Sequence, residues 1–378
     1  MKRYNLKPAF DSELTSILFR MESIRNQFIA GDTPLWLFYD LKKTLHLLES
    51  LSSARIEGNH TTLIEAINEA TKTGAQKTSQ EELLELINIQ NAINYIEENL
   101  HENDDITAVF IRELHAITVV GLRRDGSHTP GAFRTHQVAI AKSLCTVSTP
   151  QAIAGDVDEL VHYINAEHER KEDLIRIACA HHRLVQIHPF DNGNGRTARL
   201  LTYAMLIKYG FLQKKKTLLN PSSVFCMDRK KYYEMLSRAD TGTKEGIEEW
   251  CQYVAAGILS EMSKMFSLLN RDFAVKNLIL PAAKASKEDG HLSEKEYQIL
   301  IIAIEKNIIQ AADVVAIFGV TPSDKVRCSR FLSAMVEKGL LLRPPKTPKK
   351  YVARFFNKTL LSYVMSAMSA NGLIETGE

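Results

Sequence analysis

Features that would assign a protein class at once are scarce in this 378-residue chain. No apolar run approaches the roughly 18 residues of a membrane span, and residues 1–10 contain no apolar core of signal-peptide length. The five cysteines are scattered without a CxxC pair, so neither a disulfide framework nor a cysteine zinc site is indicated. The net charge is only +2, which argues against general affinity for nucleic acid or membranes. We therefore expect a cytoplasmic protein with reduced thiols and no membrane partner.

Apolar residues recur at helical spacing through most of the chain, which predicts a mostly α-helical fold. A length of 378 residues suggests two or three domains. The helices are expected at 11–30, 34–54, 61–73, 79–99, 105–118, 152–168, 171–187, 197–210, 228–239 and 244–268. The run LLTYAML within 197–210 is apolar nearly all round, which indicates a buried central helix.

The most informative stretch is 188–199, HPFDNGNGRTAR, which joins two apolar helical patterns. A loop with two glycines that opens into a helix exposes backbone N–H groups at the positive end of the helix, an arrangement that binds anions. Arg196 and Arg199 share one face of the first helical turn, and two planar guanidiniums there suit a polyphosphate. His188 has a pKa suited to a general base. A glycine-rich helix cap with solvent-facing arginines would explain single residues, but it explains the whole string poorly.

This string resembles the signature of the Fic family, HPFx(D/E)GNGRxxR. The resemblance implies a Fic helical core that transfers AMP from ATP to a protein hydroxyl, with His188 as the base and Phe190 as an anchor under the loop. The ATP-binding residues that it implies are Gly193, Asn194, Gly195, Arg196, Thr197, Ala198 and Arg199, together with Tyr232 and Tyr233 beside the adenine. Two packing tyrosines without a ligand would explain the last pair about equally well.

The family's acidic position for Mg²⁺ holds Asn192 here, and Asp191 lies one residue earlier. An amide oxygen binds hard cations more weakly than a carboxylate does. We therefore expect Mg²⁺ or Mn²⁺ to bind with reduced affinity, with Asn192 as a weak ligand and Asp191 as the alternative.

Residues 52–60, SSARIEGNH, carry the second informative pattern. Ser53 and Glu57 are four residues apart and share a helix face. We call the predicted phosphate-binding segment, residues 193–199, the cradle. A glutamate at position 57 could pair with a guanidinium of the cradle, and Arg199 is the matching partner. With Gly58, the pattern (S/T)xxxE(G/N) resembles the inhibitory motif of Fic proteins that carry the inhibitor before the core. An ordinary Glu–Gly helix end is the plainer interpretation.

Residues 121–153 interrupt the helical pattern with glycines and prolines, and Val138 and Ile140 show period-two spacing. A loop with a short β-hairpin is predicted. PGAFRTHQVAI resembles the Fic flap, which would dock the target chain by strand addition at Thr135, His136, Gln137 and Val138. A surface hairpin without a partner is the alternative.

From residue 291 the composition changes to a helix, then helix, turn, helix and two strands, which resembles a winged helix-turn-helix. Residues 291–355 hold eleven basic and six acidic residues, an excess of five positive charges. Lys325, Arg327 and Arg330 would lie on the second helix of the motif and could contact DNA phosphates. The same fold serves protein contacts equally well.

The predicted function is protein AMPylation on Ser, Thr or Tyr, inhibited by Glu57. The alternative is a DNA-binding regulator whose Fic core only senses nucleotide; a different phosphate donor or AMP removal is a further enzymatic alternative. The expected partners are a target protein, the chain itself through auto-AMPylation, DNA through the winged helix, and a second copy in a homodimer. The expected division is 1–104, an N-terminal helical region; 105–268, the Fic core; 269–290, a connector; 291–356, the winged helix; and 357–378, a helix and tail.

Overall fold

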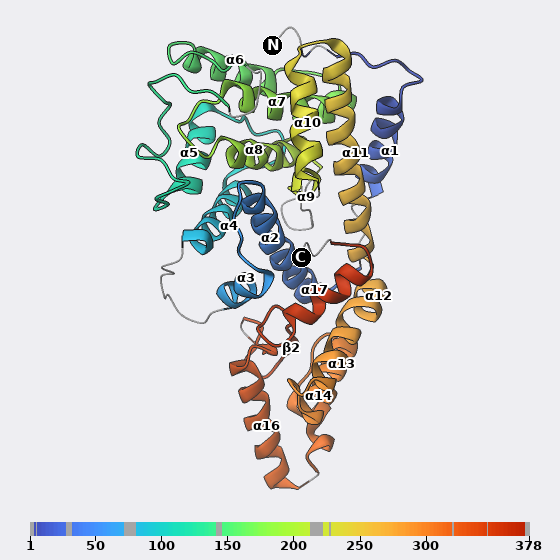
Figure 1. Cartoon of the computed structure of the whole chain (residues 1–378). Coiled ribbons are helices and arrows are strands. Elements are labelled where there is room, and N and C mark those ends of the chain that lie inside the picture. The colour runs from blue at the N-terminus through green and yellow to red at the C-terminus, as the bar shows by residue number, and fades with distance from the viewer. Residues whose placement is uncertain are drawn as a thin grey trace. The chain divides into compact units, whose positions relative to one another are not determined.

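The computed structural model describes Tyr4 and residues 6–27, 32–71, 81–140, 146–211, 222–226, 228–319, 321–345 and 347–374. The chain is mostly helical, as predicted (Figure 1). The first helices are α1 (Glu13–Gln27), α2 (Leu35–Ile56), α3 (Leu63–Ala70), α4 (Glu81–Asn99), α5 (Ala108–Val119) and α6 (Ile153–Asn165). Then follow η2 (Arg170–Glu172), α7 (Asp173–Ile187), α8 (Asn194–Lys208), α9 (Ser223–Cys226), α10 (Arg229–Asp240) and α11 (Lys244–Leu268). Within the described part of the chain, no helix combines the length and the apolar character that crossing a bilayer requires.

The chain divides into two compact units that do not follow linear boundaries. Each is described by itself. Unit 1 comprises Met1–Ile29, His46–Ala66 and Ala75–Ser263, and unit 2 comprises Ala30–Leu45, Ile67–Gly74 and Lys264–Glu378. Two segments of the expected N-terminal region thus belong with the C-terminal residues, and boundaries fall inside α2, α3 and α11. The reason is that α2 is long enough to contribute a buried face to each unit.

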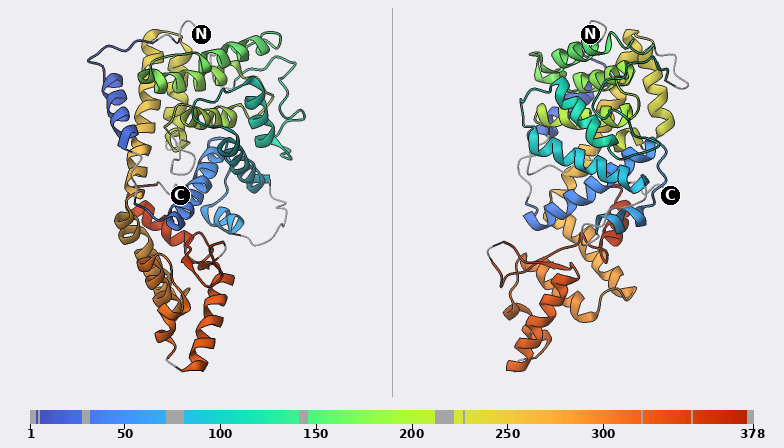
Figure 2. Two further views of the ribbon diagram at one scale, coloured as in Figure 1. Left: turned by 180° about the vertical axis from the view of Figure 1, so that it is seen from behind. Right: turned by 90° about the vertical axis from the view of Figure 1, so that its left-hand side faces the viewer.

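In unit 1, α8 is the central helix, as predicted. It packs against α7, α5 and α4, and α6 packs on α7 (Figures 1 and 2). Its run from Leu200 to Lys208 is buried throughout, because its apolar side chains point in all directions. Trp250 of α11 is fully buried and donates its indole N–H to the Ala178 carbonyl oxygen of α7 at 2.7 Å. The bond joins α11 to α7, and the packing of α7 on α8 brings together the two helices that flank the 188–193 loop.

The segment expected to form the hairpin flap has no paired strand in its described parts, 121–140 and 146–153; residues 141–145 lie outside the description. Its backbone is held by a side chain instead. Arg134 donates to the carbonyl oxygens of His136 at 2.7 Å and Ser148 at 2.5 Å, across the width of the segment. Arg134 therefore ties residues 136 and 148 of the segment together.

Unit 2 contains α12 (Arg271–Ala274), the π-helical turn η3 (Val275–Ile279), α13 (Leu280–Glu288), α14 (Glu294–Lys306), α15 (Ala311–Val314), η4 (Val315–Ile317), α16 (Pro322–Glu337), β1 (Leu341–Leu342), β2 (Val352–Ala353) and α17 (Leu361–Ala370). The interval 269–290 is therefore largely helical rather than a patternless connector. β1 and β2 pair antiparallel, with Leu341 opposite Ala353. The order α14, α15, α16, β1, β2 is the element order expected of the C-terminal module. Thr321 and Asp324 form a capping box that begins α16.

Candidate active site

The loop between α7 and α8 begins with a residue in the left-handed region. His188 has φ 50° and caps α7 by donating its N–H to the Leu184 carbonyl oxygen at 3.0 Å. Its Nδ1 lies 3.3 Å from the Val185 carbonyl oxygen, which can only accept, so the neutral ring carries its proton on Nδ1 and its lone pair on Nε2. Burial and then Arg134 lower the pKa of His188, and together they outweigh the opposing effects of Val185 and Glu57. The ring is therefore neutral at pH 7, and Nε2 can take up a proton.

Three residues shape the loop around the N-terminus of α8. Gly193 has φ 72°, and a Cβ there would lie 2.7 Å from Val119 Cγ1, so only glycine fits without strain. Asn194 closes the loop on Phe190: its Oδ1 accepts from the Phe190 N–H at 3.0 Å, and its Nδ2 donates to the Phe190 carbonyl oxygen at 2.8 Å. The first N–H groups of α8 have no partner within the helix, because the helical pattern begins there. The loop can therefore present these N–H groups to an anion.

The predicted pair between Glu57 and Arg199 is present. Arg199 Nη2 lies 2.8 Å from Glu57 Oε1, while Arg199 Nε donates to Ser53 Oγ at 2.9 Å and Nη2 donates to the Ser53 carbonyl oxygen at 3.0 Å. The guanidinium is 1% exposed, whereas the Glu57 side chain is 30% exposed. A Cβ on Gly195 would lie 2.5 Å from Glu57 Oε1. The carboxylate therefore rests against the cradle backbone, on the surface where an anion would bind.

The charges around Glu57 explain its protonation state. Loss of hydration pushes the pKa of this carboxyl up, but the charges of Arg199 and then Arg196, with the hydrogen bond from Arg199, leave the pKa below the usual 4.5. Glu57 is therefore ionised at pH 7. Because its pKa is lower in the folded protein, the stability that the pair contributes is present above about pH 4.5 and is lost on further acidification.

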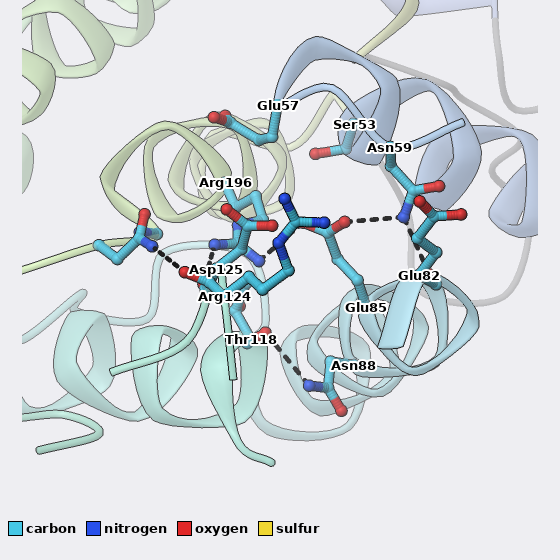
Figure 3. Close-up of polar contacts among 12 residues, drawn as sticks. Ser53, Glu57, Asn59, Glu82, Glu85, Asn88, Thr118, Arg124, Asp125 and Arg196 are labelled. Atoms are coloured by element: carbon cyan, nitrogen blue, oxygen red, sulfur yellow. Dashed lines mark hydrogen bonds and ion pairs between the residues drawn. The ribbon is translucent and has the colours of Figure 1, made fainter. Parts of the chain in front are cut away.

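Arg196 is bound by two groups from outside the cradle, neither of which the motif predicted. Its Nη1 lies 2.7 Å from Glu85 Oε1 of α4, and its Nη2 donates to the Asp125 carbonyl oxygen at 2.5 Å (Figure 3). The Arg196 and Glu85 side chains are 1% and 6% exposed. Burial raises the pKa of Glu85 despite the opposing charge of Arg196. Glu85 lies in an ordinary amphipathic pattern. The one signal in the sequence was a glutamate at a position of that pattern where a buried apolar residue is expected.

Two further residues that were not anticipated hold the loop. His115 stacks on Phe190 with ring centroids 3.7 Å apart, accepts from the Gly131 N–H at Nδ1, and donates from Nε2 to the Asn192 carbonyl oxygen. Burial lowers the pKa of His115 to about 4, so the ring stays neutral. Arg134 donates its Nε–H to the His188 carbonyl oxygen at 2.7 Å. Phe190 is fully buried, as expected of the anchor.

The remaining residues expected to bind ATP differ in their surroundings. Thr197 and Ala198 are fully buried, and Thr197 Oγ1 donates to the Gly193 carbonyl oxygen at 2.9 Å. Tyr232 is 2% exposed, and its hydroxyl lies 2.9 Å from His181 Nε2. Tyr233 is 46% exposed, so this ring offers the accessible face of the pair. Their ATP-binding roles stay predictions.

The flap residues and the metal candidates meet beside the loop. Thr135, His136 and Gln137 are exposed and Val138 is half-buried, which leaves them accessible to a partner chain. Asp191 is exposed, with Oδ1 3.7 Å from His136 Nε2. Asn192 Oδ1 already accepts from the Gly193 N–H at 2.9 Å.

These oxygens do not make a metal site by themselves. Among the described residues, no group of three or more His, Cys, Asp and Glu side chains could hold a metal ion. One exposed carboxylate and one engaged amide oxygen are fewer donors than Mg²⁺ requires, so an ion here would need most of its ligands from elsewhere.

Together the fold and the site define a helical protein with a loop suited to an anion and a neutral histidine beside it. The carboxylate of Glu57, from the turn after α2, occupies the place of that anion. Residues 105–206 match the model of the Fic/DOC family. These residues are therefore similar to a Fic domain, and over this stretch the recognition of the family from the 188–199 string is confirmed.

The relatives agree with this assignment. The protein adenylyltransferase Fic of Drosophila virilis is 31% identical over 207 residues, which cover 53% of this chain and 39% of the relative. That of Drosophila melanogaster is 32% identical over 208 residues, with the same coverage. The matched region thus spans about two fifths of these relatives. The solved structure of Fic-1 (aa134–508) from C. elegans has a TM-score of 0.54 at 25% identity, covering 67% of this chain and 72% of that one. A Fic family protein from Desulfovibrio desulfuricans G20 shares the fold over 93% of this chain and 98% of that one, with a TM-score of 0.57 at 16% identity.

Replacing the Glu57 carboxylate should reduce stability. We expect Glu57→Gln to lower the free energy of unfolding at pH 7 by about 1–2 kcal/mol, because the buried Arg199 loses a charge-assisted hydrogen bond. Urea unfolding measures this change, with the exposed Glu167→Gln as the control. The difference from wild type should shrink as the pH falls below about 4.5, where Glu57 becomes protonated. A difference that does not change with pH would contradict the pairing.

Asn192 should limit metal binding. We expect Asn192→Asp to lower the Mg²⁺ concentration that half-saturates nucleotide-dependent activity, because a carboxylate is the better ligand for a hard cation. The measurement is a Mg²⁺ titration in the Glu57→Gly background, with Asn371→Asp as the control for an added charge. If the two titrations superimpose, Asn192 is not a ligand.

Proposed function

We propose that the chain transfers AMP from ATP to a Ser, Thr or Tyr hydroxyl of a protein, and that Glu57 inhibits this reaction. The observation that carries the proposal is the position of the Glu57 carboxylate, which pairs with Arg199 directly over Gly195. A cradle that accommodates the protein's own anion is suited to a phosphate. The naming of the Drosophila relatives as protein adenylyltransferases supports ATP as the substrate.

In the proposed reaction, Nε2 of His188 takes the proton of the target hydroxyl. The hydroxyl oxygen attacks the α-phosphorus in line, the bond from the α-phosphorus to the bridging oxygen breaks, and pyrophosphate leaves. Backbone N–H groups at the start of α8 and the guanidinium of Arg196 stabilise the developing negative charge. Arg134 keeps His188 in its left-handed conformation through the carbonyl contact.

Inhibition follows from competition for Arg199. While Glu57 holds this guanidinium, Arg199 cannot bind the γ-phosphate, and the carboxylate repels that phosphate directly. ATP then binds with its α-phosphate out of line with the target hydroxyl, and small positional errors reduce the rate strongly. The exposed Thr135–Val138 segment beside the loop is the proposed docking edge for the target chain.

The transfer is tested with α-labelled ATP. We expect Glu57→Gly to increase auto-labelling strongly over wild type, and Glu57→Gly/His188→Ala to lose it by about 10²–10⁴-fold. Because the pKa of His188 is lowered, labelling should fall only at pH values below about 6.5. Equal labelling by wild type and Glu57→Gly would rule out inhibition by Glu57. Labelling that persists in the double mutant would rule out His188 as the base.

As a second function, we propose that the C-terminal module binds an anionic partner, with duplex DNA as the expected one. Lys325, Arg327 and Arg330 of α16 are all exposed and lie beside the exposed Val326. Such a face suits the phosphates of one groove edge. Protein recruitment is the alternative for the same module, and homodimer formation stays a prediction.

The DNA proposal predicts a steep dependence on salt. Random-sequence duplex DNA should be retarded in a gel at low salt. Charge reversal of Lys325, Arg327 and Arg330 should reduce the log–log salt slope by about one for each phosphate that these side chains neutralise in the wild type. Reversal of Lys276 and Lys284, which lie outside the module, serves as the control. No retardation at any salt concentration would assign the module to protein contacts.

A further inference from the structure

Side chains on one face of α4 bond to three parts of the chain: the turn at residues 57–59 that follows α2, which we call the inhibitory turn; the 120–125 loop; and the cradle. Glu81 Oε1 accepts from the N–H groups of Arg123 and Arg124, at 2.6 and 2.5 Å. Asn88 Nδ2 donates to the Val120 carbonyl oxygen at 2.8 Å. Between them on the same face lies Glu85, in the middle of the polar cluster of Figure 3. The cluster includes residues of both the cradle and the inhibitory turn.

The Glu85 carboxylate bridges two groups that are distant in sequence. Oε1 pairs with Arg196 of the cradle at 2.7 Å, and Oε2 accepts from Asn59 Nδ2 at 2.8 Å. Burying a charged pair is costly unless nearly every polar atom is satisfied. Both contacts of Glu85 are therefore needed to keep this carboxylate buried.

Asn59 fastens the turn that carries Glu57. It follows Glu57 by two residues, after Gly58 with φ 99°. Its Nδ2 also donates to the Glu82 carbonyl oxygen at 2.9 Å, and its Oδ1 accepts from the Thr61 N–H at 2.8 Å. A movement that withdraws Glu57 from the cradle also displaces Asn59, and this displacement lengthens the hydrogen bond from Asn59 Nδ2 to Glu85.

We propose that Asn59 and Glu85 are positioning residues that hold the inhibitory turn closed through Arg196. Glu57 ties the turn to the second cradle arginine, and Asn59–Glu85 ties the same turn to the first. The two cradle guanidiniums are thus neutralised together in the inhibited state. This inference rests on the proposed function of Glu57 as the inhibitor of ATP binding.

The physical basis is a linked equilibrium. Opening the turn removes one donor from a buried carboxylate, which is unfavourable unless another partner replaces it. Conversely, a phosphate that draws Arg196 away from Glu85 weakens the hold on Asn59. By linkage, ligand binding and turn opening must favour each other to the same extent.

The test uses Asn59→Asp, which keeps the side-chain size and the oxygen that accepts from Thr61. It replaces the Nδ2 donor by an oxygen that faces the Glu85 carboxylate. Asn88→Asp is the matched control, because it introduces a buried carboxylate on α4 without touching Glu57's turn or Arg196. Calorimetry gives the ratio of the dissociation constants of ADP and ATP, a readout that needs no transfer and that a general loss of stability does not move.

We expect Asn59→Asp to raise the affinity for ATP relative to ADP by about fivefold or more, with no further gain in the Glu57→Gly background. Asn88→Asp should leave the ratio within about twofold of wild type. Glu85→Gln keeps the size and shape of the side chain but removes its charge, and it should also raise the affinity for ATP relative to ADP. This variant provides the measurement if Asn59→Asp does not fold.

An unchanged ratio, a gain that persists without Glu57, or an equal gain in Asn88→Asp would overturn the proposal. The outcome is separable from that of the transfer reaction. If Glu57→Gly shifts the ratio but incorporates no label, only AMP transfer is wrong. If Glu57→Gly does not shift the ratio, inhibition by Glu57 and its support by Asn59 and Glu85 are both wrong.

Discussion

The cradle depends on one buried positive charge, the guanidinium of Arg199. At 1% exposure, this group is less stable without an anion, because neutral hydrogen-bond acceptors only partly offset the loss of hydration of a buried charge. Ser53 supplies two neutral acceptors, so the remaining requirement is a single negative charge. Glu57 meets it in this structure, and a phosphate could meet it in the same place. Under the proposed function, inhibition and nucleotide binding are therefore alternative ways to satisfy the same charge.

A neutral histidine and a rigid loop complete the arrangement. His188 adopts a left-handed conformation, which a non-glycine residue tolerates only when its surroundings hold it there. Arg134 and the His115–Phe190 stack supply that support, and burial keeps both imidazoles neutral. The residues that position His188 thus come from the flap segment and α5, whereas His188 itself lies at the end of α7.

Much of the site could be predicted from local sequence. The 188–199 string indicated the cradle and the base, because a glycine loop before a helix has a local geometry that few other roles require, and its resemblance to the Fic signature implied the anchor Phe190. The spacing of Ser53 and Glu57 placed both on one helix face, and the resemblance to the inhibitory motif indicated Arg199 as the partner, which the structure confirms. The mostly helical fold followed from apolar periodicity, which is likewise local.

Other features were decided only by the tertiary structure. Glu85 precedes Arg196 by 111 residues, and no local pattern distinguishes it from the solvated glutamates of the same helix. The helical periodicity of α2 is continuous across the boundary between the units, so it could not show that this helix is shared. In the flap, period-two spacing predicted strands, but the described residues 121–140 and 146–153 contain no paired strand, and side-chain bonds from Arg134 hold their backbone instead. Sequence alone determined which residues form the loop and the helices, because those choices are local. The tertiary structure determined which buried charges meet, because that depends on how distant helices pack.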